Sequence, residues 1–545
     1  MRFQRMSTGA LVIGAALSSI LSASPRQQAE QHAHAAPGRL GTVHFPTSCA
    51  AAVQKDFDRG VALLHSFWFS AAIESFETVL RGDPRCVMAH WGIAMSWWGN
   101  PFAGFRSPQA LKAGLAATDA AKATGAGTDR EKAYVSAVDV LFRDAATLDQ
   151  RSRTVAYEKA MESLTAKYAD DVEAKLFYAL ALNQTALPSD KSYRNQLKAA
   201  SILEQEFKRQ PEHPGLAHYI IHSFDAPPLA PRALDAARRY AKIAPDAPHA
   251  LHMPSHTFTR VGLWEESIAA NLASALAARK DNATAEELHA LDYQTYAYLQ
   301  TAQDAAAKRT VDAIAPLGGK ILTTGAGNAA PPTAGFYAFA AIPARYALER
   351  AAWSEAAALV PRQTPFPWAD AVTHFARALG AARSGNAAPG RQDVEKLAAL
   401  HQALQKANET YWAEQVDIQR RGAEAWVMLA EGRDAEALAL MRETADREDA
   451  TEKAAVTPGP LKPARELLGE MLLQLKRPAE ALVAFETTLK KEPNRFRATY
   501  GAAQAAAAAG QAKRAAGYYS ALLELARKGD RDGRKELIEA RKSSE

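Results

Sequence analysis

A 34-residue repeat is the feature that most constrains how this chain folds. Near the C-terminal end, the segment "PARELLGEMLLQLKRPAEALVAFETTLKKEPNR" carries small and large apolar residues at fixed places. With Pro493 as position 32 of its repeat, positions 8, 11, 20 and 24 are Gly469, Leu472, Ala481 and Phe485. Glycine and alanine allow two helices to approach closely, phenylalanine fills the space between them, and proline ends the second helix. This self-similarity predicts stacked helix–turn–helix units.

A second copy of the pattern lies near the other end of the chain. The segment "FDRGVALLHSFWFSAAIESFETVLRGDPR" has the same residue types at the same five positions, namely Gly60, Leu63, Ala72, Phe76 and Pro84. The two segments resemble the tetratricopeptide repeat (TPR) family, and the whole chain is similar to exported bacterial TPR proteins of uncharacterised activity. The resemblance implies an all-α fold, an α-solenoid of stacked helix–turn–helix repeats that forms a superhelix. It also implies a concave groove in which a protein or peptide partner binds.

The start of the sequence, "MRFQRMSTGALVIGAALSSILSASPRQQA", has the pattern of a secretory signal. Two arginines precede a short apolar run, and small residues follow it. The run is too short to span a bilayer comfortably, and no later segment reaches that length. We therefore expect an exported protein, periplasmic or secreted, with no membrane span in the mature chain.

Breaks in the repeat pattern suggest a division of the chain. The segment "GGKILTTGAGNAAPPTAG" reads as a flexible loop between two arrays. The predicted parts are a signal peptide at 1–24, a flexible tail at 25–46, an N-terminal array at 47–317 that holds a histidine cluster, a loop at 318–335 and a C-terminal array at 336–545.

Charge and motifs exclude several function classes. The formal net charge of +5 is small for 545 residues, and no block of Lys and Arg interleaves with aromatic residues, so we expect no nucleic-acid partner. There is no "GxSxG" segment and no glycine-rich phosphate loop. An enzyme of this sequence would have to depend on a metal, and helical solenoids mostly bind partners, so the sequence leans away from an enzyme.

The chain has two cysteines, Cys49 and Cys86. Each precedes the first helix of a repeat, and an even pair in an oxidising compartment is a disulfide candidate. We expect them to be joined; two independent buried thiols are the alternative.

Histidines concentrate in one stretch, "LAHYIIHSFDAPPLAPRALDAARRYAKIAPDAPHALHMPSHTFTR". His218 and His222 fall at positions 5 and 9 of one repeat, and His252 and His256 fall at the same positions of the next. Residues four apart share one face of a helix. These four imidazoles are therefore predicted to meet in the groove from two neighbouring helices. "HMPSH" also places a proline inside a helix, which predicts a kink.

Further polar residues fall on the same predicted face. His249 and His289 occupy position 2 of their repeats, and Tyr296 occupies position 9; with Arg260 they are predicted to line the groove as ligand-binding residues. Asp225 and Asp292 are candidate oxygen ligands beside the histidines.

Four interpretations of the cluster stay open. The first is a metal site, because neutral imidazole is a good ligand for Zn, Cu or Fe. The second is a pocket for an anion or small molecule, with the histidines as donors beside Arg260. The third is a histidine-rich groove for peptides. The fourth is packing, with each imidazole bonded to backbone groups.

An aromatic patch is a weaker candidate. Trp91, Met95 and Trp98 occupy positions 5, 9 and 12 of the second unit, where they would line the groove. Aromatic stripes at helical spacing more often belong to the core, and that is the alternative.

Taken together, the sequence predicts an exported TPR solenoid that acts as a binding and interaction module. Its groove carries a histidine cluster that is a candidate transition-metal site. The alternative is a metal-dependent enzyme, an oxidase or a hydrolase, that uses the His218, His222, His252 and His256 cluster.

Overall fold

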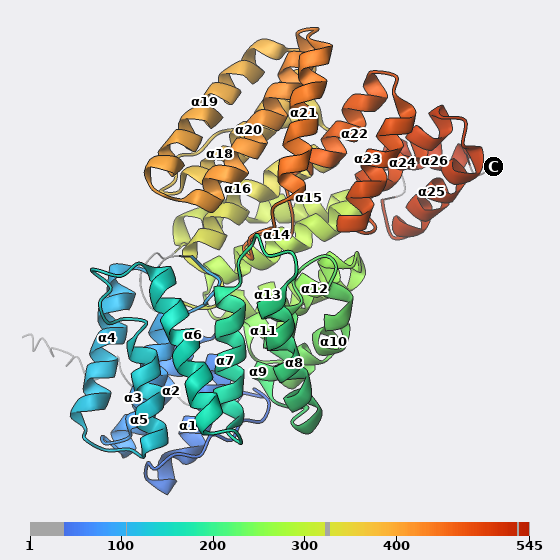
Figure 1. Ribbon diagram of the computed structural model, residues 1–545. Helices are drawn as coiled ribbons and strands as arrows, with labels where there is room; N and C mark the ends of the chain where they lie inside the picture. The colour runs from blue at the N-terminus through green and yellow to red at the C-terminus, as the bar shows by residue number, and fades with distance from the viewer. Residues whose placement is uncertain (1–37, 105, 322–326, 531–532, 544–545) are drawn as a thin grey trace, which may run out of the picture. The chain divides into compact units, whose positions relative to one another are not determined.

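A computed structural model describes residues 38–104, 106–321, 327–530 and 533–543. The predicted signal peptide at 1–24 and most of the predicted tail at 25–46 lie outside the described residues. Within the described residues every regular element is a helix, which confirms the predicted all-α fold (Figure 1).

The first half of the chain forms short antiparallel helices. They are η2 (Ala51–Val53), α1 (Gln54–His65), α2 (Phe69–Gly82), α3 (Val87–Trp98), α4 (Pro108–Ala123), α5 (Asp129–Asp139), α6 (Gln150–Lys167), α7 (Val172–Thr185), α8 (Arg194–Arg209), α9 (Pro214–Ser223), η3 (Ala230–Ala233), α10 (Leu234–Ile243), α11 (Pro248–His252), α12 (Pro254–Arg260) and α13 (Trp264–Lys280).

The second half continues the same alternation. Its helices are α14 (Thr284–Gln300), α15 (Asp304–Ala313), η4 (Ala315–Lys320), α16 (Pro332–Glu349), α17 (Trp353–Ala357), α18 (Pro367–Arg383), α19 (Ala387–Lys406), α20 (Thr410–Ala430), α21 (Asp434–Asp449), α22 (Ala464–Gln474), α23 (Pro478–Lys491), α24 (Phe496–Ala508), α25 (Ala512–Leu525) and α26 (Lys535–Lys542). Each α-helix from α1 to α26 packs against the next one in the chain, as stacked helix–turn–helix units require.

The repeat residues do what their spacing predicts. Phe76 lies so close to Gly60 and Gly92 that a Cβ atom on either glycine would come within 2.6 Å of its ring. At the other end, Phe485 leaves the same lack of space beside Gly469 and Gly501. Only glycine lets the helices close around this ring, so both ends of the chain are built from one TPR-like unit.

Two large hydrophobic cores correspond only partly to the two predicted arrays. The first core is made almost entirely by residues between Leu40 and Phe258, and the second by residues between Ala302 and Ala540. Helix α14 packs against α13 before the predicted loop and against α16 after it. The stack of helices therefore continues across the predicted loop at 318–335, of which residues 322–326 are not described.

Cys49 and Cys86 form a disulfide in the structure. Their sulfur atoms are 2.08 Å apart and their Cα atoms 4.9 Å apart, within the ordinary range for a disulfide. The bond joins the segment before α1 to the start of α3, so it fixes the first repeat against the second.

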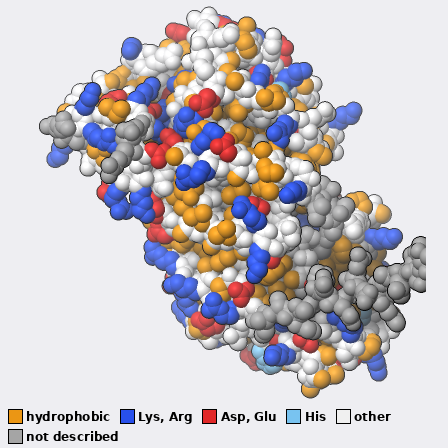
Figure 2. All heavy atoms as spheres, turned by 180° about the vertical axis from the view of Figure 1, so that it is seen from behind, with side chains coloured by type: hydrophobic (Ala, Val, Ile, Leu, Met, Phe, Trp, Pro, Cys, Tyr) orange, Lys and Arg blue, Asp and Glu red, His pale blue; other side chains and the backbone are white. Residues whose placement is uncertain are grey.

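The surface and the helix lengths bear on the predicted partners. None of the helices in the described part of the chain is long and apolar enough to cross a membrane. On the face seen in Figure 2, Lys and Arg side chains lie dispersed among acidic and hydrophobic ones.

Candidate metal centre

Four helices bring six histidines together. His218 and His222 lie one turn apart on α9, and His256 lies on α12; the other three are His249 and His252 on α11 and His289 on α14. Helix α11 ends at His252 and α12 begins at Pro254, where a break in the helix was predicted. These helices are neighbours in the stack (Figure 1).

The six imidazoles form two groups of three. The first trio is His218, His222 and His249; the second trio is His252, His256 and His289. Within each trio, one ring nitrogen from each residue lies within 4.8 Å of the others. The Nε2 atoms of His218 and His222 are 3.1 Å apart, and so are those of His252 and His256.

The two trios are adjacent. The ring centroids of His249 and His252 are 5.9 Å apart, and those of His222 and His256 are 6.5 Å apart. The sequence predicted a square of four imidazoles from two repeats. The structure adds His249 and His289, which were predicted to line a ligand groove. Each trio combines two histidines of one repeat with one histidine of the next repeat.

Outer hydrogen bonds hold three of these rings by Nδ1. His218 Nδ1 lies 2.6 Å from the carbonyl oxygen of His65, His252 Nδ1 lies 2.7 Å from Asn271 Oδ1, and His256 Nδ1 lies 3.0 Å from Asp225 Oδ2. Each acceptor fixes a proton on Nδ1, which leaves Nε2 with a free lone pair directed into its trio. Metal-binding histidines are oriented in this way.

Two other rings have polar atoms without a partner. Neither nitrogen of His249 has a hydrogen-bond partner in the described residues, and Nδ1 of His289 has none either. Both rings are buried, and leaving such atoms unpaired in the interior costs about 1–3 kcal/mol each. This observation argues against simple packing as the reason for the cluster.

The histidines are buried rather than exposed on an open groove. Five of the six rings are buried and His222 is half-buried. Phe102 stacks on His222 at 4.3 Å between centroids, and Tyr293 stacks on His256 at 4.9 Å. Burial is the largest cause that lowers the pKa of every member of the two trios, to about 3 for His218 and His289. The rings are therefore neutral at ordinary pH, as metal ligation requires.

Asp225 supports the second trio from outside. Its carboxylate accepts hydrogen bonds from His256 and from Arg260 Nε at 2.8 Å, and Lys453 Nζ lies 3.3 Å away. These cations and the bond from His256 hold the pKa of Asp225 well below its usual range, against the effect of burial. Asp225 is therefore held by cations rather than directed into the trio as an oxygen ligand, and Arg260, predicted to line a ligand groove, pairs with it at the edge of a second cavity.

The other candidate site residues lie outside the two trios, and Tyr296 lines a second cavity. Asp292 pairs with the buried Arg345 at 2.7 Å, outside both trios. Tyr296 donates to Glu492 and accepts from Arg495 in the C-terminal half. The predicted aromatic groove patch, made of Trp91, Met95 and Trp98, is buried in the first hydrophobic core, as the alternative expected.

A small opening reaches the cluster. The mouth, as we call it, has a cavity volume of about 20 Å³ and is lined on its polar side by His222, His249, His256 and His289. Its apolar side includes Phe102, Met253, Ala330 and Val456. Both trios therefore share one entrance with a mostly apolar rim.

A third histidine group lies behind the first trio. His65 Nε2 and His213 Nε2 lie 2.8 and 3.0 Å from the two carboxylate oxygens of Glu173. His65 packs against Gly215, where a Cβ atom would come within 2.6 Å of the imidazole, so the ring is fixed in place. Because the backbone oxygen of His65 orients His218, we interpret this group as a support for the first trio.

Sequence reasoning missed several of these residues. Glu173, Phe102 and Lys453 reach the cluster from helices or loops far away in the chain, and their local sequence carries no signal of it. His213 was visible as part of the local excess of histidine, since six of the fourteen histidines fall between His213 and His256.

Comparisons with known proteins were made against families, curated sequences and solved structures. No family model and no curated protein matches the chain. The crystal structure of yeast Tom70 is 10% identical, with 90% of this chain and 95% of that chain covered and a TM-score of 0.28. The Cut9–Hcn1 hetero-tetramer of the APC/C is 12% identical, with 91% and 96% covered and a TM-score of 0.31.

The P58(IPK) TPR domain is 11% identical, with 90% of this chain and 98% of that chain covered and a TM-score of 0.20. These TM-scores are too low to carry an argument about this chain. The helix pairs described above define it as a TPR-like, all-α protein, and six histidines form a buried cluster within it.

Proposed function

We propose that this protein is a metalloprotein whose two trios each hold one transition-metal ion, so that the pair forms a two-metal centre. The observation that carries the proposal is a set of ring nitrogens that the protein alone does not satisfy: Nε2 of His252 and Nε2 of His256 face each other at 3.1 Å although the proton of each ring is held on Nδ1. Outer acceptors hold three rings by Nδ1 and direct their Nε2 atoms inward, and His249 has no partner for either nitrogen in the described part of the chain. A bound ion would satisfy them.

Copper is the metal that the ligand set favours. All six ligands are neutral imidazoles, which suit copper, zinc and iron. Among divalent ions of the first transition row, copper binds nitrogen sites most tightly; because this order holds for most sites, we propose copper as the first metal to test and zinc and iron as the alternatives. Copper held in this way supplies one-electron and dioxygen chemistry, so we assign the centre to the redox class, as an oxidase rather than a hydrolase.

The residues of this chain then have distinct roles. The trios bind the ions, His65, Asn271 and Asp225 orient three of the rings, and Phe102 covers His222 at the mouth. The apolar rim excludes bulk water and admits only a small molecule. Asp225 and Asp292, the two predicted oxygen ligands, are engaged by Arg260, Lys453 and Arg345, so neither is free to activate water as a base.

Metal content of the untagged mature protein tests the proposal. After loading with copper and desalting, mass spectrometry should find about two copper ions per chain. The variant His218→Ala/His222→Ala should retain about one, and the variant that also carries His252→Ala/His256→Ala should retain none. His401→Ala, which removes a histidine far from the cluster, should leave the content unchanged. Less than one ion per folded chain in the parent would refute the proposal.

A protein or peptide partner is the second candidate function. Leu272 and Leu276 lie one turn apart on α13 and are 43% and 63% exposed. Two adjacent exposed leucines are a candidate contact for an apolar partner surface. A partner that crosslinks to the parent chain but not to Leu272→Glu/Leu276→Glu would support this candidate, while equal crosslinking of the two would argue against this site.

Export remains part of the proposed function. The Cys49–Cys86 disulfide supports it, because disulfides persist in oxidising compartments. Fractionation of cells that express the full chain, with thiol labelling of the unreduced and unfolded protein, tests it. Cytosolic protein with two free thiols would exclude it.

A further inference from the structure

A second cavity lies beside the metal centre and is separate from the mouth. It has a cavity volume of about 60 Å³, and it shares no lining residue with the mouth. Helices α16, α18 and α20 and the segment 451–464 wall it. We call it the aromatic cavity.

The segment 451–464 forms the partition between the two spaces. Ala455 and Val456 line the mouth, whereas Lys453 and Thr457 line the aromatic cavity. Arg345 fixes the position of the partition, because it donates to the carbonyl oxygens of Gly459 and Pro460 at 2.9 and 3.0 Å. Hydrogen bonds therefore fix the wall that separates the aromatic cavity from the mouth.

Aromatic rings form its apolar part. Tyr337 and Phe375 are buried, and Trp412 stacks on Trp368 with a centroid distance of 4.4 Å and an interplanar angle of 14°. Tyr337 and Trp412 lie 6.0 Å apart. Walls of this kind favour a planar aromatic body, because rings pack by offset stacking and edge-to-face contact.

Two glutamines on α20 present polar atoms without partners. Gln415 Nε2 and Gln419 Oε1 are buried and have no hydrogen-bond partner in the described residues. The two residues are four apart, so they share one face of the helix, and both line the cavity. One offers a donor and the other an acceptor, so a ligand that carries a hydroxyl or amide group would satisfy both.

Cationic side chains outnumber acidic ones on the cavity wall, which is lined by Arg260, Lys453, Lys462 and Lys491 and by Glu448 and Glu492. Arg260 and Lys453 share the single carboxylate of Asp225. Lys491 contacts only the carbonyl oxygens of Glu448 and Thr451, and no ion-pair partner for it lies among the described residues. The side chain of Glu448, which also lines the cavity, has its pKa raised to about 7 by burial, so it offsets only part of this charge at neutral pH.

We propose that the aromatic cavity binds a small aromatic carboxylate that carries a hydroxyl or amide group. The ring lies against Tyr337 and Trp412, the carboxylate balances the excess cations, and the polar group pairs with Gln415 and Gln419. The proposal does not require metal in the two trios, although Asp225 contacts both His256 and the cavity cations Arg260 and Lys453.

Calorimetric titration of the full chain tests this site. The probe is 4-hydroxybenzoate, with methyl 4-hydroxybenzoate as the neutral analogue and cyclohexanecarboxylate as the non-aromatic one. We expect saturable binding of 4-hydroxybenzoate that is at least about tenfold tighter than that of either analogue. Equal binding in metal-free and copper-loaded protein would separate this site from the metal centre. No saturation by 4-hydroxybenzoate up to about 1 mM, or equal binding of all three compounds, would overturn the proposal.

Variants of the glutamines distinguish a ligand site from a structural role. In Gln415→Leu/Gln419→Leu we expect binding to weaken about tenfold, because two hydrogen bonds to the ligand are lost. The same variant should unfold at a higher temperature than the parent when no ligand is present, because two unsatisfied buried atoms have been removed. Gln402→Leu, at an exposed position on α19, is the control and should change neither quantity. A lower unfolding temperature with unchanged binding would identify the glutamines as structural.

Discussion

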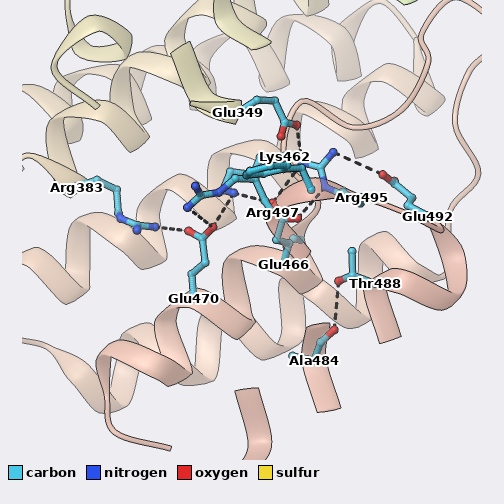
Figure 3. Close-up of polar contacts among 12 residues, drawn as sticks. Glu349, Arg383, Lys462, Glu466, Glu470, Ala484, Thr488, Glu492, Arg495 and Arg497 are labelled. Carbon is cyan, nitrogen blue, oxygen red and sulfur yellow. Dashed lines mark hydrogen bonds and ion pairs between the residues drawn. The ribbon is translucent and has the colours of Figure 1, made fainter. Parts of the chain in front are cut away.

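Two regions of this molecule bury polar side chains, and they differ in whether those side chains have partners within the protein. In the C-terminal half, Arg495 donates to Glu466 at 2.7 Å and to Glu349 at 2.6 Å, and Lys462 joins Glu466 to Glu470 (Figure 3). Every group in this ion network has an opposite charge beside it. In the histidine cluster the rings are neutral, and several nitrogens have no partner in the described residues.

The difference teaches how to tell a structural group from a functional one. Every charge of the ion network is paired without a ligand, although Glu349 Oε2 and Arg497 Nε have no hydrogen-bond partner in the described residues, so most of its energy is available to the fold. The histidine cluster is incomplete without one, so it costs stability in the metal-free chain. The predictions below test this contrast, beginning with the largest expected effect.

Removal of a cation from the ion network should be severely destabilising. Arg495→Met leaves Glu349 and Glu466 buried without their main cation, which should lower the free energy of unfolding by about 3–5 kcal/mol. Urea unfolding followed by circular dichroism measures the effect. The control is Arg477→Met, which breaks an exposed pair with Glu480 and should cost about 0–1 kcal/mol. Equal losses in both variants would mean that the network is not what stabilises this half.

Removal of a histidine of the cluster should not lower the free energy of unfolding of metal-free protein. His249→Leu deletes two unpaired nitrogens, so the metal-free variant should be at least as stable as the parent. The parent should gain about 2.7 kcal/mol for each site when free copper is 100 times its dissociation constant. The variant should gain that amount from the second trio alone, as measured by thermal unfolding with and without copper. A strongly destabilised metal-free variant would show that His249 is a packing residue.

Loss of an outer acceptor should weaken the metal without removing it. Asn271→Leu takes away the acceptor for His252 Nδ1 and should weaken copper binding at the second trio by about 10–100-fold. Asn271→Asp keeps an oxygen in the same place and should bind close to normally. Competition with a chelator of known affinity measures both. If Asn271→Leu bound copper as tightly as the parent, the outer bond would have no orienting role.

The pH dependence should separate the two regions by their titration ranges. Burial lowers the pKa of the folded His218 from 6.5 to about 3, so the unfolded chain binds more protons between these values. The stability of metal-free protein should therefore fall as pH decreases below about 6.5, by up to about 1.4 kcal/mol per pH unit for each such histidine.

The carboxylates of the ion network respond later. Lys462 and the neighbouring arginines hold the pKa of Glu470 below its usual 4.5, so its contribution is lost only as pH falls below about 4.5. The burial-raised pKa values of Glu286 and Glu448, about 7 each, act in the opposite direction between 4.5 and 7. Between pH 7 and 5, the free energy of unfolding of metal-free protein should fall less steeply with decreasing pH for His218→Gln than for the parent. Identical slopes would contradict the contribution of the histidines.

Much of the fold could be predicted because the repeat is a local property. The spacing from Gly60 to Phe76, and from Gly469 to Phe485, specifies one helix pair each, and such pairs stack only on their neighbours. The same repeat register predicted that four histidines lie at equivalent positions in the first helices of two successive repeats. The sequence carried less information about the division into arrays. The predicted loop at 318–335 reads as a break, yet α14, which precedes it, packs against α16, which begins within it.

The site could be predicted only in part, because its members come from distant helices. The sequence by itself determined the helix pairs and the four imidazoles at positions 5 and 9, since both follow from helical periodicity and repeat length. Only the tertiary structure decided that His249 and His289 complete the trios, that Asp225 and Asp292 face cations instead, and that the cluster is buried under Phe102 and the partition. The physical reason is that hydrogen-bond partners and burial depend on groups far apart in the chain, which periodicity does not encode.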